Sequence, residues 1–575
     1  MSSPPRVSLS RLPGERVLAV ERDTETDLAM GDLTDYVRER EAGGADRPRW
    51  VWDDTARWYP PLLAAGVRVE RAHDLRLCHH LLRRAPSVDA SLLEGEGSEH
   101  WHRLGPASAL PPGLFSLDDD VEHLRADHED ERQRAAVAAS TEARRLALLL
   151  AAESSGALAA AEMSFAGVPW RVDVHERLLA DLLGRRPPRG ARPGLLEALA
   201  DEVRAAFEAP GLSPDSRPEL LAALRRAGLD VADTRASSLR RLEHPGIAPL
   251  LRYKQLAHLF STNGWTWLDQ WVRDNRFRPS YQPAGSSTGR WSSNGGGALS
   301  IPVQVRPAAI ADDGWVLVVA DVAQLEPRVL AGMSGDRALA KAARGTDLYQ
   351  GMVDDGAVAS RNDAKLGLLG AMYGATTGES GRMVADLTRR YPAAFGLVED
   401  AARAGERGQV VRTLLGRGSP SLGEAWDRDP DAAPLDPESQ TRYRRAYGRF
   451  TRNFVVQGTG AEWALCWIAD LRNRLWRLAA TGPLDARPHL VFFLHDEVVI
   501  HTPAALADAV VAAAADAATA AAGLLFGGAG GPGVPAVDFP LTTSVVRSYA
   551  EAGKPGTAEA DPPSSAELRP GAPAR

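Results

Sequence analysis

The sequence predicts a multidomain α/β protein. Its 575 residues are enough for roughly three to five domains of ordinary size. Strongly apolar strand patterns occur near both ends of the chain and in its middle, and long helical patterns lie between them. Hydrophobic residues make up 44% of the chain and charged residues 25%, so a sizeable core can be buried and a wholly disordered chain is excluded.

The predicted elements follow one another in a clear order. Residues 1–115 predict a small α/β unit of short apolar runs and loops rich in Pro, Gly and Asp. After a charged stretch at 118–134 come helices over 136–275, strands and turns over 276–330, helices over 335–485, and strands at 489–500 and 538–548. The tail from residue 553 has five prolines and one large hydrophobe, so we expect it to be disordered.

Composition excludes several classes of protein. The net charge of −8 argues against a surface that is basic throughout. Cys78 and Cys466 are far apart and outside any CxxC motif, so we expect no disulfide framework, no cysteine zinc site and a reducing compartment. The N-terminus lacks an apolar core, and Asp508 and Asp516 interrupt the alanine-rich stretch 504–526, so we expect neither a signal peptide nor a membrane span.

Two predicted strands end in carboxylates. Asp321 follows an apolar run, and Asp496 and Glu497 separate the runs 490–494 and 498–500, which predicts a hairpin with acids at its turn. Two carboxylates about 4 Å apart repel each other by roughly 4 kcal/mol at an effective dielectric constant of 20, a cost that a divalent cation would remove. Solvated strand-end residues are the alternative, and the neighbouring residues decide between the two.

Five segments around these acids follow one another along the chain: 287–293, 321–336, Arg361-x3-Lys365-x7-Tyr373-Gly374, Arg449-x3-Asn453-x3-Gln457 and His495-Asp496-Glu497. The second, third and fifth resemble motifs A, B and C of family A DNA polymerases, the DNA polymerase I type, and all five occur in that family's order. The resemblance covers roughly residues 136–550. It implies a ribonuclease-H-like domain of the 3′–5′ exonuclease type over 1–135 and a right-hand polymerase domain over 136–552. Within that domain the thumb would span about 136–285, the palm about 286–335 and 445–552, and the fingers about 336–444.

The chemistry that the resemblance implies is two-metal phosphoryl transfer. Asp321 and Asp496 would hold two Mg²⁺ ions, with the backbone carbonyl of Val322 as a further ligand and Glu497 nearby. Such a pair of ions activates the primer 3′-hydroxyl and neutralises the triphosphate and the leaving pyrophosphate. Oxygen ligands without His or Cys suit Mg²⁺.

Four side chains at successive fourth positions share one side of a predicted helix: Arg361, Lys365, Leu369 and Tyr373. The resemblance implies that this side faces the nucleotide, that Arg361 and Lys365 bind its phosphates, and that Lys365 also acts as a catalytic acid toward pyrophosphate. A solvated basic face is the alternative. Gly367 and Gly370 each cost about 1 kcal/mol relative to Ala in a helix, and close approach of a base would explain them. Leu369 stands where the family usually has an aromatic residue, so we expect altered handling of dideoxy and other sugar-modified nucleotides.

The resemblance also implies further contacts. Glu326 would be the steric gate, packed against Tyr373 so that it fills the space of a ribose 2′-hydroxyl, and Gln324 would belong to the nucleotide site. The implied DNA contacts are Arg290, Arg328, Arg449, Asn453, Gln457 and His495. Basic residues concentrate between Arg240 and Arg290 and in the helical stripe Arg442, Arg445, Arg449 and Arg452, which fits duplex phosphate binding. The segments on both sides of motif B are short for the family, so we expect trimmed fingers.

The N-terminal unit stands where the family carries its exonuclease. The letters of 23–27 match that exonuclease's first motif, but the polar pair 21–22 precedes them and no Tyr-x3-Asp follows. His123-x3-Asp127 is a poor substitute, and Asp74 is one acid that could survive. We therefore expect a structural domain without proofreading activity, with active proofreading as the alternative, and no 5′-nuclease domain ahead of it.

Other candidate motifs lack necessary companions. The histidines of 79–80 and 100–102 have no further ligands nearby in the sequence, and the glycine run 527–531 lacks the Lys-Ser/Thr of a phosphate loop. We expect these segments to be loops.

The prediction from sequence is therefore a template-dependent DNA polymerase. We expect primer–template DNA and dNTPs as partners, a role in repair or replication, no membrane association, and a monomer in the cytoplasm near the nucleoid. A single-subunit RNA polymerase is one alternative, against which Glu326 argues. A non-catalytic DNA-binding accessory protein is another, but DNA binding alone does not require Asp321, Lys365 and Asp496 at their positions.

Overall fold

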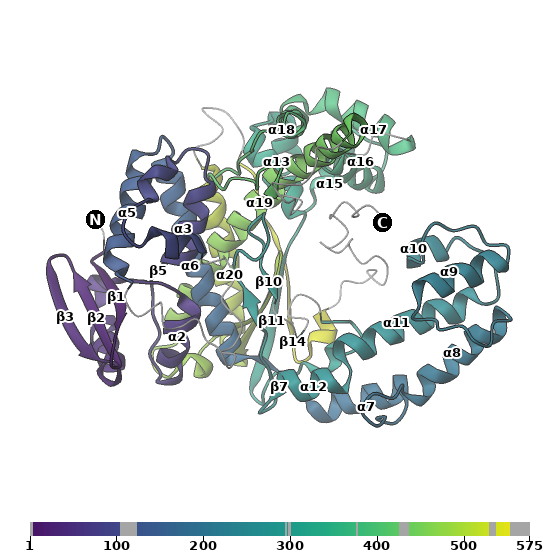
Figure 1. Cartoon of the computed structure of the whole chain (residues 1–575), viewed down its shortest axis with the longest axis horizontal. Coiled ribbons are helices and arrows are strands. Elements are labelled where there is room, and N and C mark those ends of the chain that lie inside the picture. Colours follow the sequence, from purple (N-terminus) through teal and green to yellow (C-terminus); the bar gives the residue numbers. More distant parts are fainter. Residues whose placement is uncertain are drawn as a thin grey trace.

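The computed structural model describes residues 4–103, 124–293, 296, 301–374, 378–424, 436–527 and 536–552. A sheet domain lies at one end of the molecule, a second sheet stands at its centre, and two helical lobes extend from the central sheet on the side away from the first domain (Figure 1). The predicted α/β class is confirmed. The predicted tail, 553–575, lies outside the described residues.

The N-terminal domain is built on a five-stranded sheet with the order β3-β2-β1-β4-β5. Strands β1, β2 and β3 are antiparallel, whereas β4 is parallel to β1 and β5 to β4. The buried core of this domain includes Val7, Leu9, Trp50 and Trp52 of the sheet. The elements are β1 (Arg6–Leu12), β2 (Arg16–Glu21), β3 (Thr24–Ala29), α1 (Leu33–Glu41), β4 (Arg49–Trp52), α2 (Thr55–Ala64), β5 (Ala72–Asp74), α3 (Leu75–Arg84), α4 (Ser98–Arg103) and α5 (Ala126–Ala139).

Helix α6 (Ala143–Ala166) connects the N-terminal domain to the centre of the molecule. It packs against α2 and β5 on one side, and against β12 and the long helix α19 (Pro437–Arg477) on another. Gly156 permits this approach, because a Cβ there would lie 2.6 Å from Cδ2 of Leu465. The predicted boundary at residue 135 falls inside α5.

The central sheet has the order β12-β13-β11-β14, and all its neighbours are antiparallel. Strand β11 is apolar along most of its length because both of its faces are buried. Val318 and Ala320 pack in the core that includes α19 and α20, whereas Leu317 and Val319 pack in the core of the first helical lobe. The strands of this sheet are β11 (Trp315–Val322), β12 (His489–Leu494), β13 (Glu497–Pro503) and β14 (Leu541–Val546). A short three-stranded sheet has the order β6-β8-β7 and a two-stranded sheet joins β9 and β10; these strands are β6 (Val168–Pro169), β7 (Val272–Arg273), β8 (Arg276–Phe277), β9 (Tyr281–Gln282) and β10 (Ser292–Ser293).

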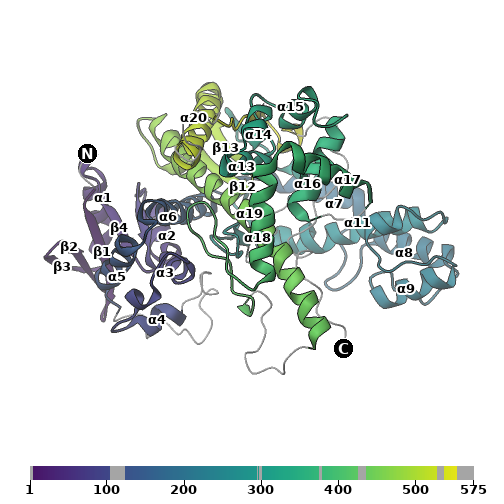
Figure 2. The same ribbon diagram turned by 90° about the horizontal axis from the view of Figure 1, so that it is seen from above.

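Two helical lobes flank the open side of the central sheet (Figure 1). The first lobe contains α7 (Val172–Leu183), α8 (Gly194–Ala206), α9 (Arg217–Arg226), α10 (Ala236–Leu239), α11 (Ile247–Asn263) and α12 (Trp265–Trp271). The second contains α13 (Leu325–Ser334), α14 (Arg337–Ala342), α15 (Leu348–Asp354), α16 (Arg361–Tyr373), α17 (Gly378–Arg390) and α18 (Pro392–Glu406). Figure 2 shows α18 and α19 side by side, and α19 continues from there to pack against α20 and α6.

Two helical segments, Ala143–Ala166 and Ala504–Phe526, are long and apolar enough to cross a membrane by length and composition alone, which the sequence analysis did not anticipate. The most apolar window of the first is 72% buried inside the protein. The second contains α20 (Ala507–Phe526), whose residues Val510, Ala514, Ala517 and Ala521 form a buried stripe at helical spacing. This stripe packs against α19 and the central sheet, and 39% of the most apolar window of the second segment is buried.

Candidate active site

The two segments that carry acids meet at one end of the central sheet. Strand β11 pairs with β13 so that Asp321 lies opposite Glu497. Between β12 and β13 the chain turns at His495, which has a left-handed backbone conformation (φ 55°), and at Asp496. The backbone N–H of Val322 donates to the carbonyl oxygen of Asp496 (2.9 Å), so the two segments are held side by side. The predicted hairpin with acids at its turn is confirmed.

The carboxylates of this site influence one another. Burial and, as the next largest cause, the charge of Asp321 together raise the pKa of Asp496 to about 7, while Arg290 opposes the rise. The carboxylate of Glu497 accepts a hydrogen bond from the hydroxyl of Tyr549. Within the described ranges no group of three or more His, Cys, Asp or Glu side chains is suited to a metal ion. Oxygen donors from two mutually repelling carboxylates nevertheless fit Mg²⁺, because a cation would relieve their repulsion.

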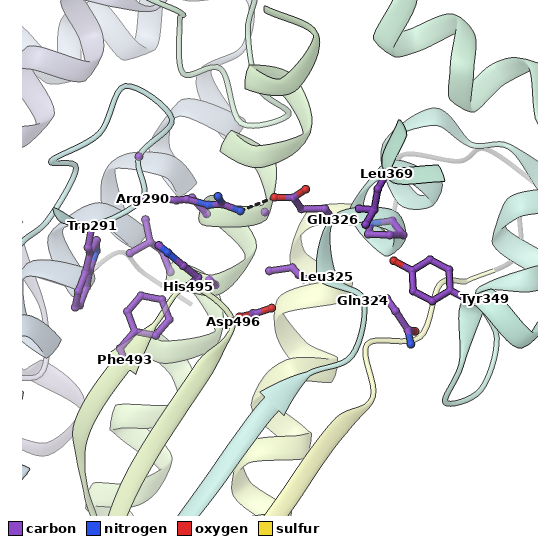
Figure 3. A pocket seen from close by; sticks show the side chains of 16 residues that line it. Arg290, Trp291, Gln324, Leu325, Glu326, Tyr349, Leu369, Phe493, His495 and Asp496 are labelled. Carbon is purple, nitrogen blue, oxygen red and sulfur yellow. Dashed lines mark hydrogen bonds and ion pairs between the residues drawn. The ribbon is translucent and has the colours of Figure 1, made fainter. Parts of the chain in front are cut away.

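A cavity of about 190 Å³ opens beside Asp496 (Figure 3). Its lining brings together six segments of the chain: Gly289, Arg290 and Trp291 before β11; Gln324, Leu325, Glu326 and Pro327 at the start of α13; Tyr349 of α15; Leu369 of α16; residues of α19; and Phe493, His495 and Asp496 at the end of β12 and in the turn after it. The surrounding protein and the charge of Arg290 lower the pKa of His495 to about 4, so its imidazole is neutral at pH 7. The cavity beside Asp496 is therefore lined by three residues that the sequence assigned to the nucleotide and by two that it assigned to DNA: Gln324, Glu326 and Leu369, and Arg290 and His495.

Glu326 is held from two sides. The hydroxyl of Tyr373 donates to Oε2 of Glu326 (3.0 Å), which confirms the predicted contact between the two side chains. The guanidinium of Arg290 forms an ion pair with Oε1 of Glu326 (2.5 Å; Figure 3). Burial and the charge of Glu326 raise the pKa of Tyr373, so the phenol remains a donor at neutral pH. Arg290, which the sequence assigned to DNA, here contacts Glu326 instead.

The segment that the sequence predicted as helical forms helix α16, which runs from Arg361 to Tyr373. Arg361 forms an ion pair with Asp347 (2.7 Å). Lys365 is exposed and has no ion-pair partner among the described residues. The prediction that a base approaches Gly367 is wrong: this glycine is buried, and a Cβ there would lie 2.7 Å from Cδ1 of Leu387 in α17. Packing between the two helices is therefore what requires the glycine.

Arg328 does not lie where DNA could contact it. Its side chain is fully buried, and its guanidinium donates to the carbonyl oxygens of Ala323, Ala343, Gly345 and Asp538 at 2.6–3.1 Å. The prediction of a DNA contact is therefore wrong, because Arg328 points from α13 into the protein and joins three loops. Gln324 takes part in the same network, accepting from Arg328 (3.2 Å) and donating to Asp347 (3.3 Å).

The arginine stripe of α19 is shorter than predicted. Arg442, Arg445 and Arg449 are exposed, but Arg452 donates to the carbonyl oxygen of Ala371 (2.9 Å) and forms an ion pair with Glu399. Arg452 therefore joins α19 to α16 and α18 and is not part of a DNA-binding face. Further along the helix, Asn453 and Gln457 are only 9% and 7% exposed.

The basic segment between Arg240 and Arg290 is also partly engaged within the protein. Arg276 forms an ion pair with Asp312 (2.5 Å), and Arg278 donates to the carbonyl oxygen of Phe165. The exposed members are Arg240, Arg241, Arg252 and Arg273. About half of the basic side chains in the predicted groove are thus exposed and can contact an external ligand. All of these exposed side chains lie on or next to the first lobe.

The acids that the sequence offered as exonuclease candidates do not converge. Asp23, Glu25 and Asp27 lie in or beside the edge strand β3 and are exposed, and Glu25 forms an ion pair with Arg125 (2.6 Å). Asp74 is buried; its carboxylate accepts from the backbone N–H groups of Thr55 (2.8 Å) and Leu77 (3.0 Å), and so caps α3. The alternative motif at 123–127 begins at a residue outside the described ranges.

The histidine segments are not loops, contrary to the prediction. His79 and His80 lie in α3, and His100 and His102 lie in α4. His79 is buried against Glu129 (2.7 Å), which explains its place in a helix facing the core. Of the glycine run, residues 528–531 lie outside the described residues.

Sequence reasoning missed Tyr349 and Asp347 as residues of the site. Asp347 caps α15 by accepting from the backbone N–H groups of Tyr349 and Gln350, a pattern that the Asp before an apolar residue could have signalled. Nothing in a single sequence reveals that Tyr349 enters the cavity, because its neighbours there come from distant segments.

Comparisons with known proteins agree on one family. The model of DNA polymerase family A matches residues 220–526, just over half of the chain. Thermostable DNA polymerase I of Thermus aquaticus is 26% identical over 502 residues, covering 78% of this chain and 53% of that protein, and that of Thermus filiformis is 28% identical over 404 residues, covering 59% and 44%. The chain thus spans about half the length of these relatives. Among solved structures, the POL domain of Pol1 from M. smegmatis, in complex with DNA primer-template and dNTP, shares the fold with a TM-score of 0.67 at 18% identity, covering 96% of each chain.

Proposed function

The chain belongs to DNA polymerase family A, and on that basis we propose that it is a template-dependent DNA polymerase that extends a primer 3′-hydroxyl with deoxynucleoside triphosphates. The observation that carries this proposal is the convergence of Asp321 and Asp496 at the end of the central sheet, beside a cavity that also holds Glu326. A protein that only binds DNA has no need of two adjacent carboxylates that repel each other.

Asp321 and Asp496, with the carbonyl of Val322, would hold two Mg²⁺ ions. When bound, these ions supply activation of the primer hydroxyl and neutralisation of the triphosphate. The raised pKa of Asp496 supports this assignment, because the carboxylate pair is disfavoured without a cation. Glu497 has a different role in the proposal: its hydrogen bond with Tyr549 steadies the start of β13.

The side chains of α16 bind the triphosphate in this proposal. The exposed ammonium of Lys365 contacts a phosphate and donates its proton to the leaving pyrophosphate. Arg361 exchanges its ion pair with Asp347 for a phosphate oxygen. That exchange is inexpensive because the pair is partly exposed to solvent.

Glu326 is the sugar gate. Tyr373 and Arg290 hold its carboxylate from two sides, so it cannot easily move away from a ribose 2′-hydroxyl. Deoxynucleotides are therefore preferred, and the alternative of an RNA polymerase is disfavoured. Leu369 forms an apolar wall of the same cavity.

The central sheet would be the palm, the lobe α7–α12 the thumb, and the lobe α13–α18 the fingers, with duplex DNA between the lobes. The likeness to the POL domain of M. smegmatis Pol1, which was solved with primer–template and dNTP, supports this arrangement. Arg449, His495, Asn453 and Gln457 would contact the duplex, the last two at minor-groove acceptors shared by all base pairs. Arg290 stays paired with Glu326 in this proposal.

The N-terminal domain is ribonuclease-H-like in this proposal but has no exonuclease activity. Its sheet order, with three antiparallel strands followed by two parallel ones, supports the first part. The engagement of Asp74 in helix capping and of Glu25 in an ion pair supports the second. We further propose a monomeric enzyme of DNA repair or replication in the cytoplasm.

The test is extension of a 5′-labelled primer on a template with Mg²⁺, by the wild type and by Asp496→Asn. Asp516→Asn is the matched control, because Asp516 is exposed on α20, pairs with Arg474 and lies outside the cavity. Extension by the wild type and the control alone is the expected result, whereas a wild type that extends no primer would refute the polymerase. In lanes without dNTPs the primer should stay intact; shortening that persists in Asp496→Asn would mean that the N-terminal domain is an active exonuclease.

A further inference from the structure

The hydroxyl of Tyr281, in β9, holds the backbone of one residue at the edge of the central sheet. It donates to the carbonyl oxygen of Phe493 (3.1 Å) and accepts from the backbone N–H of the same residue (2.9 Å). Phe493 belongs to β12, which is an edge strand of the sheet, and such a strand presents N–H and C=O groups on its outer side. A hydroxyl can donate and accept at once. One side chain therefore satisfies both backbone groups of Phe493.

The chain that Tyr281 holds leads directly into the turn with His495 and Asp496. His495 is the second residue after Phe493, and its backbone is left-handed (φ 55°), a conformation that costs free energy in any residue with a Cβ and persists only where the surroundings impose it. On the side of β11, the backbone N–H of Val322 donates to the carbonyl oxygen of Asp496 (2.9 Å). On the opposite side, the phenol of Tyr281 fixes the strand just before the turn. The turn is thus held from two directions.

The position of Tyr281 is itself fixed by the segment that carries Arg290. Strand β9 pairs with β10, and Tyr281 lies opposite Ser293. The ring of Tyr281 packs on that of Trp291 (centroids 5.1 Å apart), which meets the ring of Phe493 edge to face (4.9 Å; Figure 3). Desolvation by the surrounding protein raises the pKa of Tyr281, so the phenol keeps its proton at neutral pH. Tyr281 therefore joins the segment with Arg290 and Trp291, which lines the cavity, to the strand before the turn.

We infer that Tyr281 is a positioning residue: by holding Phe493, it keeps the carboxylate of Asp496 where it can share metal ions with Asp321. The inference rests on the proposed function and deepens it. Asp321 lies on β11, which β13 separates from β12, so the distance between the two carboxylates depends on where the turn after β12 lies. Without the phenol, the end of β12 loses two hydrogen bonds and the turn can shift. A displacement of about 1 Å can cost about 100-fold in rate. Tyr281 itself contacts neither substrate nor metal in this inference.

The test compares the wild type, Tyr281→Phe and the matched control Tyr447→Phe. Tyr447 is a buried tyrosine outside the cavity whose hydroxyl also donates to a backbone carbonyl oxygen, that of Pro420 (2.6 Å). In primer extension with Mg²⁺, Tyr281→Phe should lower kcat about 10- to 100-fold and leave the Kd for primer–template within about twofold. The control should keep both values.

A second measurement does not depend on turnover. Mn²⁺, which oxygen ligands also bind, is titrated into each protein in complex with dNTP and a primer that ends in a dideoxynucleotide, and free Mn²⁺ is measured by electron paramagnetic resonance. The affinity for Mn²⁺ should fall several-fold in Tyr281→Phe and stay unchanged in Tyr447→Phe. Thermal unfolding of both variants completes the comparison: each loses a phenol bonded to the backbone, so both should show a similar decrease in Tm.

The outcomes separate the inference from the proposed function. A Tyr281→Phe variant with a lowered Tm but the kcat and Mn²⁺ affinity of the wild type would overturn the inference, because Tyr281 would then only stabilise the fold, while the polymerase assignment stands. An equal loss of kcat in Tyr447→Phe would mean a general loosening of the protein and would likewise overturn it. A raised Kd for primer–template at unchanged kcat would assign Tyr281 to DNA binding instead. A wild type that extends no primer would refute the proposed function, and the inference with it.

Discussion

Replacing Arg472 by Met should loosen the N-terminal domain from α19. Arg472 is 3% exposed and donates to both carboxylate oxygens of Glu162 in α6 and to the carbonyl oxygens of Val69 (2.7 Å) and Glu70 (2.9 Å) in the N-terminal domain. Glu162 also pairs with Arg68 (3.2 Å). One buried cluster therefore joins the N-terminal domain, α6 and the long helix that carries Asn453 and Gln457.

The magnitude follows from the groups that the substitution leaves behind. Two buried carbonyl oxygens would lose their donor, at about 1–3 kcal/mol each. Glu162 would keep Arg68, so the loss of Arg472 costs less than isolating a buried carboxylate. Together these effects predict a loss of about 3–5 kcal/mol in the free energy of unfolding, a large part of the roughly 5–15 kcal/mol of a typical protein.

Thermal unfolding of the wild type, Arg472→Met and the control Arg474→Met measures this effect. Arg474 makes partly exposed ion pairs on the same helix, so its loss should cost under about 1 kcal/mol. Burial alone would raise the pKa of Glu162, but Arg472 and Arg68 outweigh it and lower that pKa. The stabilisation by ionised Glu162 is therefore present above the ordinary carboxyl pKa and is lost as pH falls through the pKa of Glu162 in the folded protein. The difference in Tm between the wild type and Arg472→Met should therefore become smaller in acid. A Tm for Arg472→Met equal to that of Arg474→Met at pH 7 would refute the reasoning.

Three further predictions test the site and its supports. Glu326→Ala should lower the preference for dNTP over rNTP about 10- to 100-fold in kcat/KM, since crowding by an extra group costs about 1–3 kcal/mol, and an unchanged preference would contradict the gate. Burial raises the pKa of Glu462 to about 7, so the free energy of unfolding of the wild type should fall by about 3 kcal/mol as pH rises from about 4.5 to 7. Glu462→Gln cannot ionise and should not show this loss. Parallel curves of Tm against pH for the wild type and Glu462→Gln would contradict the prediction. Gly367→Ala should lower Tm because its Cβ meets Leu387, whereas Gly396→Ala in α18, where a Cβ meets nothing within 4 Å, should raise it; the opposite order would contradict the packing argument.

The parts of the site that the sequence predicted are those with local signals. Helix α16 begins after Ser360, whose side chain caps it, and ends at Gly374 in the left-handed region, so its bounds could be read directly. Asp321 and the β12–β13 turn follow apolar runs that only buried strands explain. The contact between Glu326 and Tyr373 came from the family resemblance, and the hydrogen bond between them confirms it.

The order of the elements and the residues at their ends could be predicted from local patterns, because capping, periodicity and strand length depend on neighbours along the chain. The residues that each helix face contacts come from distant segments and are known only from the folded structure. Arg328 and Arg452 lie at sequence positions where DNA-binding arginines are expected. In the folded protein they instead bind carbonyl oxygens and a carboxylate of distant segments. The need for glycine at position 367 arises from its contact with Leu387, and Tyr349 lines the cavity beside residues of distant segments. Both follow from the mutual orientation of helices, which no local sequence pattern encodes.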